Sequence, residues 1–219
     1  DTVVAWLKQN GFFPEGADDD LLLASLMATA NLLRNHLPVD EIPLVVLSLL
    51  ALDQDPAFEV PVEFNQITGH LSGDTLGEVK RGIAGLRITD YARAANQVVD
   101  RFLGVGSRGD RSQYSTSTSL SSAALIAAAA TTAGSAQTVL DPACGIAGTL
   151  LGVGAATPEA ELFGAELNPS TAALARLLGH FADRAVTIHT GDSILDDPFP
   201  ETKADLVVCE PPLRSEERR

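Results

Sequence analysis

The spacing of hydrophobic residues changes once along the chain. Up to about residue 107, apolar positions recur at helical intervals and prolines interrupt them, a pattern that predicts a run of helices. Residues 42–52 are apolar on nearly every side, which predicts a buried helix. The predicted helices cover residues 3–10, 20–37, 39–53 and 90–105, with short helices or turns across 69–85. One apolar stripe, predicted to face the core, consists of Leu22, Leu23, Leu26, Met27 and Leu33.

From Gln137 onward short apolar strands alternate with helices. The predicted strands are 138–141, 161–165, 185–190 and 205–209, and the predicted helices between them are 147–156 and 169–181. Such alternation predicts a parallel sheet with right-handed crossovers, and therefore an α/β fold. We expect two domains: an all-helical N-terminal domain at residues 1–107 and an α/β domain at residues 108–219.

Composition and charge limit the function classes. With 219 residues, 45% of them hydrophobic and 20% charged, the chain predicts a globular protein of one large or two small domains. No apolar run is long enough to span a membrane and no signal peptide is visible. Cys144 and Cys209 offer neither a metal-ligand spacing nor a disulfide framework, which favours a cytoplasmic location and no metal site. The four histidines lack a recognisable catalytic partner and are interpreted as structural or exposed.

The segment Asp141-Pro-Ala-Cys-Gly-Ile-Ala-Gly148 is the strongest candidate for chemistry. A strand runs into a turn of small residues, and a helix follows. Small residues let the backbone approach a ligand, and the helix N-terminus presents free N–H groups to it. Three further polar motifs end predicted strands: residues 163–168, 190–193 and 207–213. Because ligands in parallel sheets bind at the carboxyl ends of the strands, all four motifs are expected to surround one pocket.

Glu166 ends the second predicted strand. A carboxylate at this place can bind both hydroxyls of a ribose, whereas the simpler interpretation is a surface acid. Asn168 then precedes Pro169 at the start of a predicted helix and is interpreted as its N-cap.

These motifs resemble those of the S-adenosylmethionine-dependent N-6 adenine DNA methyltransferases, in particular the methylation subunits of type I restriction-modification systems and their actinobacterial relatives. The resemblance covers about residues 108–214. It implies an α/β, Rossmann-like methyltransferase fold, here incomplete, with S-adenosyl-L-methionine as cofactor. It also implies that Asp141, Ala143, Gly145 and Glu166 bind that cofactor.

Within this resemblance, Asp192 corresponds to the residue that accepts a hydrogen bond from the cofactor's adenine, although a turn-forming aspartate would look the same in sequence. The family's first motif has a second glycine where this chain has Ala147, and we expect the methyl group to narrow the space beside the cofactor.

A polar segment, residues 108–119, joins the two predicted domains. Its serines and threonines can cap the Ala-rich helix predicted at 120–132. Related methyltransferases carry a motif here that contacts the methionine end of the cofactor, and the resemblance assigns this contact to Tyr114 and Thr116. The two interpretations are compatible.

The resemblance places catalysis at Glu210-Pro211-Pro212-Leu213, where the family carries Asn, Asp or Ser, then two prolines and an aromatic residue. The first residue accepts hydrogen bonds from the target amino group, and the aromatic residue stacks on the flipped-out base. Glu210 can accept these bonds through a longer side chain, while Leu213 has no π-face. The simpler alternative is a proline-rich exit from a strand.

A net charge of −14 and the lack of a basic face bear on the partners. DNA binding relies on Lys and Arg. We therefore expect DNA to be held by regions outside this chain or by a partner subunit, with specificity and restriction subunits as possible partners and no membrane contact. The chain is also expected to be a fragment, because the family fold adds about three strands after the catalytic loop.

Two alternatives to a DNA methyltransferase remain. The first is a catalytically degenerate methyltransferase-like module that regulates or binds, which is favoured by Ala147, Ser117, Glu210 and Leu213. The second is a methylase of a protein amide or a small molecule, against which the Asp-Pro-Ala-Cys-Gly motif argues.

Overall fold

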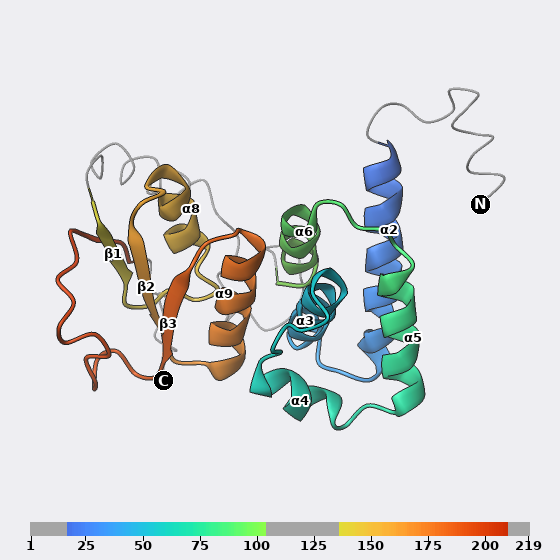
Figure 1. The fold of residues 1–219 in the computed structure, drawn as a ribbon. Coiled ribbons are helices and arrows are strands. Elements are labelled where there is room, and N and C mark those ends of the chain that lie inside the picture. The colour runs from blue at the N-terminus through green and yellow to red at the C-terminus, as the bar shows by residue number, and fades with distance from the viewer. Residues whose placement is uncertain (1–16, 104–135, 210–219) are drawn as a thin grey trace, which may run out of the picture.

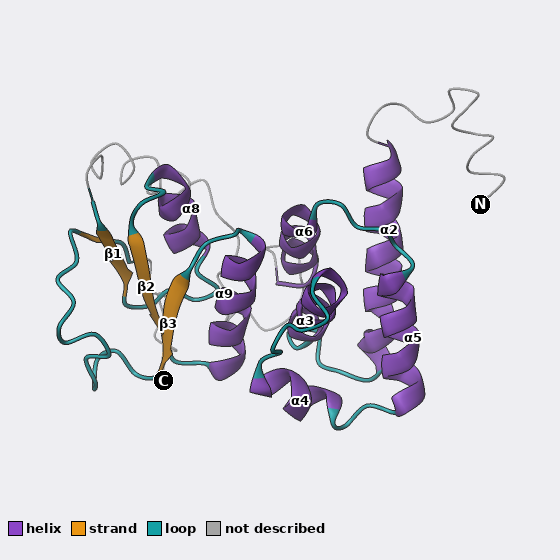
Figure 2. Ribbon diagram, in the orientation of Figure 1, coloured by secondary structure: helices purple, strands orange, loops and turns teal. Residues whose placement is uncertain are grey.

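The computed structural model describes residues 17–103 and 136–209 of the chain (Figure 1). Up to Leu103 the described chain is helical, and after Ala136 strands and helices alternate (Figure 2). The helices of the first part are α2 (Ala17–Asn31), the 3-10 helix η1 (Leu32–Asn35), α3 (Ile42–Gln54), α4 (Val62–Thr68), α5 (Gly73–Ala84) and α6 (Tyr91–Leu103). The second part contains β1 (Thr138–Asp141), α8 (Gly148–Ala156), β2 (Glu161–Glu166), α9 (Pro169–Phe181), β3 (Val186–Thr190) and β4 (Leu206–Val207).

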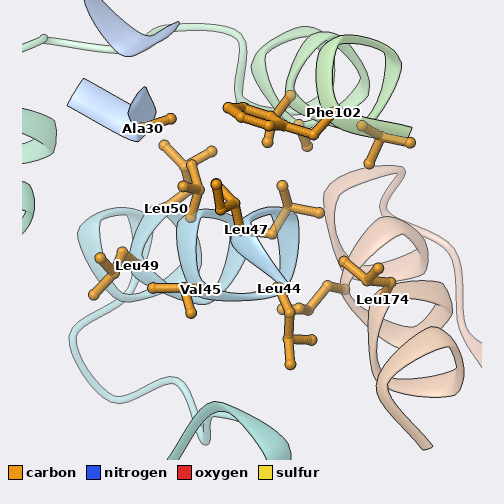
Figure 3. Close-up of a cluster of buried hydrophobic side chains, with 14 of the residues drawn as sticks. Ala30, Leu44, Val45, Leu47, Leu49, Leu50, Phe102 and Leu174 are labelled. Atoms are coloured by element: carbon orange, nitrogen blue, oxygen red, sulfur yellow. The ribbon is translucent and has the colours of Figure 1, made fainter. Parts of the chain in front are cut away.

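Helix α3 is the centre of the helical part. All ten residues from Ile42 to Ala51 are buried, as expected for a helix that is apolar all round. Phe102 of α6 lies on one side of α3 and Leu174 of α9 on another (Figure 3). We call this large cluster, which includes buried residues of α2, α3, α5, α6 and α9, the bundle core.

Local signals set where the surrounding helices begin. The Ser72 side chain accepts a hydrogen bond from the Thr75 N–H and caps α5. Asn168 does the same for α9 by accepting from the Thr171 N–H, and Pro169 occupies the first turn. Arg34 of η1 lies over the Phe102 ring, 5.4 Å from its centroid, and adds a cation–π contact to the bundle core.

The four strands form one parallel sheet in the order β3-β2-β1-β4. Val139 pairs with Leu162 and Gly164 pairs with Ile188, so these residues share one face of the sheet. That face is covered by α8 and α9, and its buried residues form a second cluster, the sheet-side core. On the opposite face Phe163 packs edge-on against Phe199, with ring centroids 5.2 Å apart.

Helix α9 joins the two parts of the molecule. Ala172 and Ala175 face the sheet-side core, whereas Leu174, Leu177 and Phe181 belong to the bundle core. Figure 1 shows α9 between the sheet and the helices α3 and α6. The helical part and the α/β part therefore meet through a buried apolar interface.

The predicted elements agree with the structure in type and order, but several bounds differ, and the two-turn helix α4 (Val62–Thr68) was not predicted. The helix expected at residues 20–37 begins at Ala17, ends as an α-helix at Asn31 and continues as the 3-10 helix η1; Pro38 stops the chain from continuing as a helix beyond this turn. The segment 69–85 contains a full three-turn helix, α5, since Ser72 supplies a cap. The last strand is assigned over two residues only, although hydrogen bonds from Asp205 N to Thr138 O and from Val208 N to Leu140 O extend its ladder.

Some predictions fall outside the described residues. They are the helices at 3–10 and 120–132 and the linker at 108–119. The domain boundary expected between residues 107 and 108 lies in the same undescribed range and stays a prediction.

Candidate functional site

The strand order fixes the place where a ligand can bind. Strands β2 and β3 lie on one side of β1, while β4 lies on the other, so the connections change direction at β1. In open parallel sheets the crevice at such a switch point, outside the carboxyl ends of the strands, is the usual ligand site. Asp141 is the last residue of β1 and opens this crevice.

Residues 142–148, which we call the cofactor turn, connect β1 to α8. Gly145 has φ +55° and Ala147 has φ +63°, so two residues of this turn adopt left-handed backbone conformations. The N–H of Ala147 donates to the Cys144 carbonyl at 2.8 Å, and the Cys144 N–H donates to the Ala165 carbonyl of β2 at 2.9 Å. These bonds hold the turn against the neighbouring strand.

Two glycines of the cofactor turn have free space where a side chain would be. A Cβ atom placed on Gly145 or on Gly148 would meet nothing within 4 Å. Ala147, by contrast, is fully buried in the sheet-side core. The expectation that its methyl group narrows the pocket is therefore corrected, because the left-handed backbone directs the methyl group into the core.

Asp141 lies beneath the turn. Its side chain is only 2% exposed, and Oδ1 accepts a hydrogen bond from the Ala143 N–H at 3.0 Å. Next to it the buried thiol of Cys144 packs over Gly164, where a Cβ would come within 2.8 Å of Sγ. Burial, together with the carboxylates of Asp141 and Glu166, raises the pKa of the Cys144 thiol to about 12. Cys144 is therefore a neutral packing residue at physiological pH.

Glu166 ends β2, one strand away from Asp141. Its Oε1 accepts a hydrogen bond from the Asn168 N–H at 2.7 Å, which orients the half-buried carboxylate at the strand end. The Glu166 carbonyl accepts from the Gly191 N–H at 3.0 Å and ties the loop after β3 to this position. Since a carboxylate has about four lone-pair sites, Glu166 keeps capacity to accept further hydrogen bonds.

Asp192 lies in the loop that follows β3. Its Oδ1 accepts from the Ile194 N–H at 2.9 Å and from the Leu195 N–H at 3.3 Å, the contacts of a turn-forming aspartate. The neighbouring Ser193 hydroxyl donates to the Pro142 carbonyl at 2.7 Å. This bond crosses 51 residues of sequence and brings the Asp192 loop against the cofactor turn.

Three residues that follow Glu166 or Asp192 by one or two positions had no role assigned from the sequence. Ser193 lies in the motif at residues 190–193, but nothing in the sequence indicates its bond to Pro142, because that bond depends on the order of the strands in the sheet. Leu167 and Ile194 are 68% and 92% exposed, unusually high values for large apolar side chains. Leu167 follows Glu166 by one residue and Ile194 follows Asp192 by two, and a large apolar residue directly after such a carboxylate is the signal that could have identified them.

The structure thus brings Asp141, Ala143, Gly145, Glu166 and Asp192 to one edge of the sheet. The remaining predicted site residues lie outside the described range, and they are Tyr114, Thr116, Glu210, Pro211, Pro212 and Leu213. Val208 and Cys209 lead from β4 toward the predicted catalytic loop, and β4 pairs with β1.

Residues 17–103 and 136–209 contain neither a metal-binding cluster nor a membrane-spanning helix. No three His, Cys, Asp or Glu residues there come together in a way that could hold a metal ion. None of the helices in these ranges has both the length and the apolar character needed to cross a bilayer.

Comparison with solved structures defines the class of fold. Over 90% of its length the chain matches a protein described as a class I S-adenosylmethionine-dependent methyltransferase from Listeria monocytogenes, with a TM-score of 0.60 and 16% identity. Over 88% it matches the type I restriction-modification methyltransferase subunit from Streptococcus thermophilus, with a TM-score of 0.62 and 14% identity. The fold is therefore that of the S-adenosylmethionine-dependent methyltransferases. The chain spans 59% and 63% of these two proteins.

The sequence also identifies the family. Residues 106–218, more than half of the chain, match the family model of the N-6 DNA methylases. The chain belongs to the N-6 DNA methylase family, which confirms the resemblance inferred from its motifs. No functionally curated protein matches the sequence.

Proposed function

We propose that this protein takes part in the methylation of adenine in DNA at the exocyclic N-6 amino group, with S-adenosyl-L-methionine as methyl donor, within a modification or restriction-modification system. The observation that carries the proposal is the meeting of Asp141, Glu166 and Asp192 around a glycine turn at the switch point of the sheet. Family membership supports the reaction class.

The residues at the carboxyl edge fit a nucleoside-type cofactor. Gly145 and Gly148 have no atoms crowding them in the cofactor turn, and α8 begins at the end of this turn, so that its first N–H groups are available to a ligand. We assign the ribose hydroxyls to Glu166, the adenine to Asp192 and the exposed side chains of Leu167 and Ile194, and the methionine end to Tyr114 and Thr116. When bound there, S-adenosylmethionine would supply an electrophilic methyl group.

The target amino group is assigned to the loop Glu210-Pro211-Pro212-Leu213. Two prolines stiffen this loop so that its hydrogen-bond acceptors stay aimed. Glu210 would hold the amino group in line with the methyl group, a positioning task that is sensitive to displacements of about 1 Å. Leu213 replaces the family's aromatic residue, and the loss of base stacking weakens capture of a flipped-out base by about 1–3 kcal/mol.

DNA binding requires help from elsewhere in the assembly. The net charge of −14 repels phosphates, so we assign most of the DNA contact to regions outside this chain or to partner specificity and restriction subunits. In this arrangement residues 1–107 form a helical domain that supports a catalytic domain beginning at residue 108, and the protein works in the cytoplasm.

A second candidate function is a catalytically degenerate module that binds the cofactor or a partner without transferring a methyl group. The specific observation in its favour is the pair Glu210 and Leu213, since both depart from the family's catalytic loop. A rate measurement separates the two candidates.

The experiment is a radiolabelled-methyl transfer assay on DNA, with partner subunits present and N6-methyladenine identified in the digested product. We expect slow transfer by the natural sequence and faster transfer by the double variant Glu210→Asn with Leu213→Phe, which restores the amide acceptor and the stacking ring. Leu213→Ile serves as a control that adds no ring. Fast transfer by the natural sequence that is lost in the double variant would instead show that the Glu-Leu pair is itself the working arrangement. No transfer by either protein would favour the degenerate module.

A further inference from the structure

The cofactor turn is attached to both hydrophobic cores of the molecule. Cys144 and Ala147 belong to the sheet-side core. Ile146, which lies between them in sequence, is 6% exposed and belongs to the bundle core, together with Val99 of α6 and Leu178 and Phe181 of α9. Successive side chains of one turn therefore pack in opposite directions.

The backbone on both sides of Ile146 is left-handed. Gly145 and Ala147 have φ values of +55° and +63°; glycine adopts this region readily, whereas Ala147 is strained there because it has a Cβ atom. Such conformations persist only when surrounding contacts hold them. The turn has its hydrogen bonds on the sheet side, from Cys144 N to Ala165 O and from Ser193 Oγ to Pro142 O. On the bundle side, Ile146 supplies the buried apolar contact.

The surroundings of Ile146 differ from those of an ordinary core side chain. It lines a cavity of about 270 Å³ between α6, α8 and α9, and Gly148 at the start of α8 lines the same cavity. Asn96 and Asp100 of α6 form part of its wall. The contact that fixes the turn thus lies at the junction of the helical part with the α/β part, beside a space that leaves room for movement.

We propose that Ile146 is a positioning residue through which the helical bundle holds the cofactor turn in its binding conformation. This inference rests on the proposed function for its link to S-adenosylmethionine. Ile146 does not have to touch the cofactor. It acts by fixing the left-handed residues on either side, and through them the start of α8.

The test uses two matched truncations in the same core. Ile146→Ala removes the anchor, whereas Ile83→Ala removes the same atoms from α5, where Ile83 is 1% exposed in the bundle core but distant in sequence from the turn. Hydrogen exchange of the Ala147 amide, which is bonded to the Cys144 carbonyl, is measured in the free proteins, and calorimetry gives the S-adenosylmethionine affinity.

For Ile146→Ala we expect about tenfold faster hydrogen exchange at the Ala147 amide. We also expect about tenfold weaker cofactor binding, equivalent to about 1.4 kcal/mol. Ile83→Ala should lower the melting temperature without changing the exchange rate or the affinity. Ile146→Val should change the exchange rate and the cofactor affinity in the same direction but by less. It replaces Ile146→Ala in the experiment if the alanine variant does not fold. Unchanged exchange at Ala147 in the Ile146 variants, or an equal change in Ile83→Ala, would overturn the proposal. If the natural protein binds no S-adenosylmethionine, the proposed function fails, and the exchange measurement still decides whether Ile146 holds the turn.

Discussion

At the scale of single residues, the backbone angles of the cofactor turn explain which side chains it tolerates. Ala147 stands where the family has glycine and still adopts φ +63°, because its methyl group fits into the sheet-side core. Gly145, at φ +55°, has open space where a side chain would be. Conformation and available space are therefore separate constraints at these two positions, and they can be tested separately.

Gly145→Ala should destabilise the protein by about 1 kcal/mol, because the left-handed region penalises a Cβ atom. Gly148→Ala is the matched control. A Cβ at Gly148 also meets nothing within 4 Å, but Gly148 is the first residue of α8 and is not among the positive-φ residues. Urea unfolding of both variants measures the difference. An equal loss of stability in the two would show that the backbone conformation at residue 145 is not the cause.

The buried thiol of Cys144 makes stability depend on pH in the alkaline range. Its pKa is raised to about 12 by burial and by the carboxylates of Asp141 and Glu166, so the folded protein keeps a proton that the unfolded chain loses above its ordinary thiol pKa. This contribution to stability is complete below about pH 8.5 and is lost as the pH rises toward 12.

We expect the free energy of unfolding to fall more steeply between pH 8.5 and about 11 in the natural protein than in Cys144→Ala. Urea titrations at several pH values measure both slopes. Parallel slopes would contradict the assigned burial of the thiol.

At the scale of elements, α3 combines an apolar surface with one polar residue in the core. Ser48 is fully buried, and its hydroxyl has no hydrogen-bond partner within the described part of the chain. A buried hydroxyl without a partner destabilises a protein. The helix is stable in spite of Ser48 because its other buried residues pack against α6 and α9 (Figure 3).

Ser48→Ala should therefore raise the free energy of unfolding by about 1 kcal/mol. Ser25→Ala in α2 is the control, because it makes the same change at an exposed site where the hydroxyl bonds to the Leu21 carbonyl within the helix. Both variants gain the higher helix propensity of alanine, so their difference in thermal or urea unfolding isolates the buried hydroxyl. A stabilisation no larger than that of Ser25→Ala would contradict this account of α3.

The elements also show what the sequence could predict. Periodicity did not predict the short helix α4 (Val62–Thr68), but it predicted the strands and the longer described helices, since a buried helix such as α3 and a strand such as β2 have distinct patterns. Their ends were less predictable, because they depend on local devices such as the Ser72 cap and the 3-10 turn after Asn31. The bond between Ser193 and Pro142 could not be predicted, since it follows from strand order rather than from spacing.

At the scale of the whole molecule, α9 makes one structure of the helical and the α/β parts. The two faces of α9 contribute to different cores. Phe181 at the end of α9 also stacks on Tyr91 at the start of α6. The Tyr91 hydroxyl donates to Asp53 Oδ2 at 2.9 Å and so connects α6 to the end of α3. The helical part is thereby placed where it supports the carboxyl edge of the sheet through α9 and the cofactor turn.

If the carboxyl edge of the sheet binds S-adenosylmethionine through Glu166, the affinity measured by calorimetric titration of the cofactor should depend on this carboxylate. We compare the natural protein with Glu166→Ala and with Glu161→Ala, which removes an exposed carboxylate from the opposite end of the same strand. We expect the natural protein to bind the cofactor and Glu161→Ala to bind it with unchanged affinity. In Glu166→Ala the binding free energy should weaken by about 1–3 kcal/mol, as expected for hydrogen bonds to a charged group. Absence of binding by the natural protein, or full affinity in a folded Glu166→Ala variant, would contradict cofactor binding at this edge through Glu166.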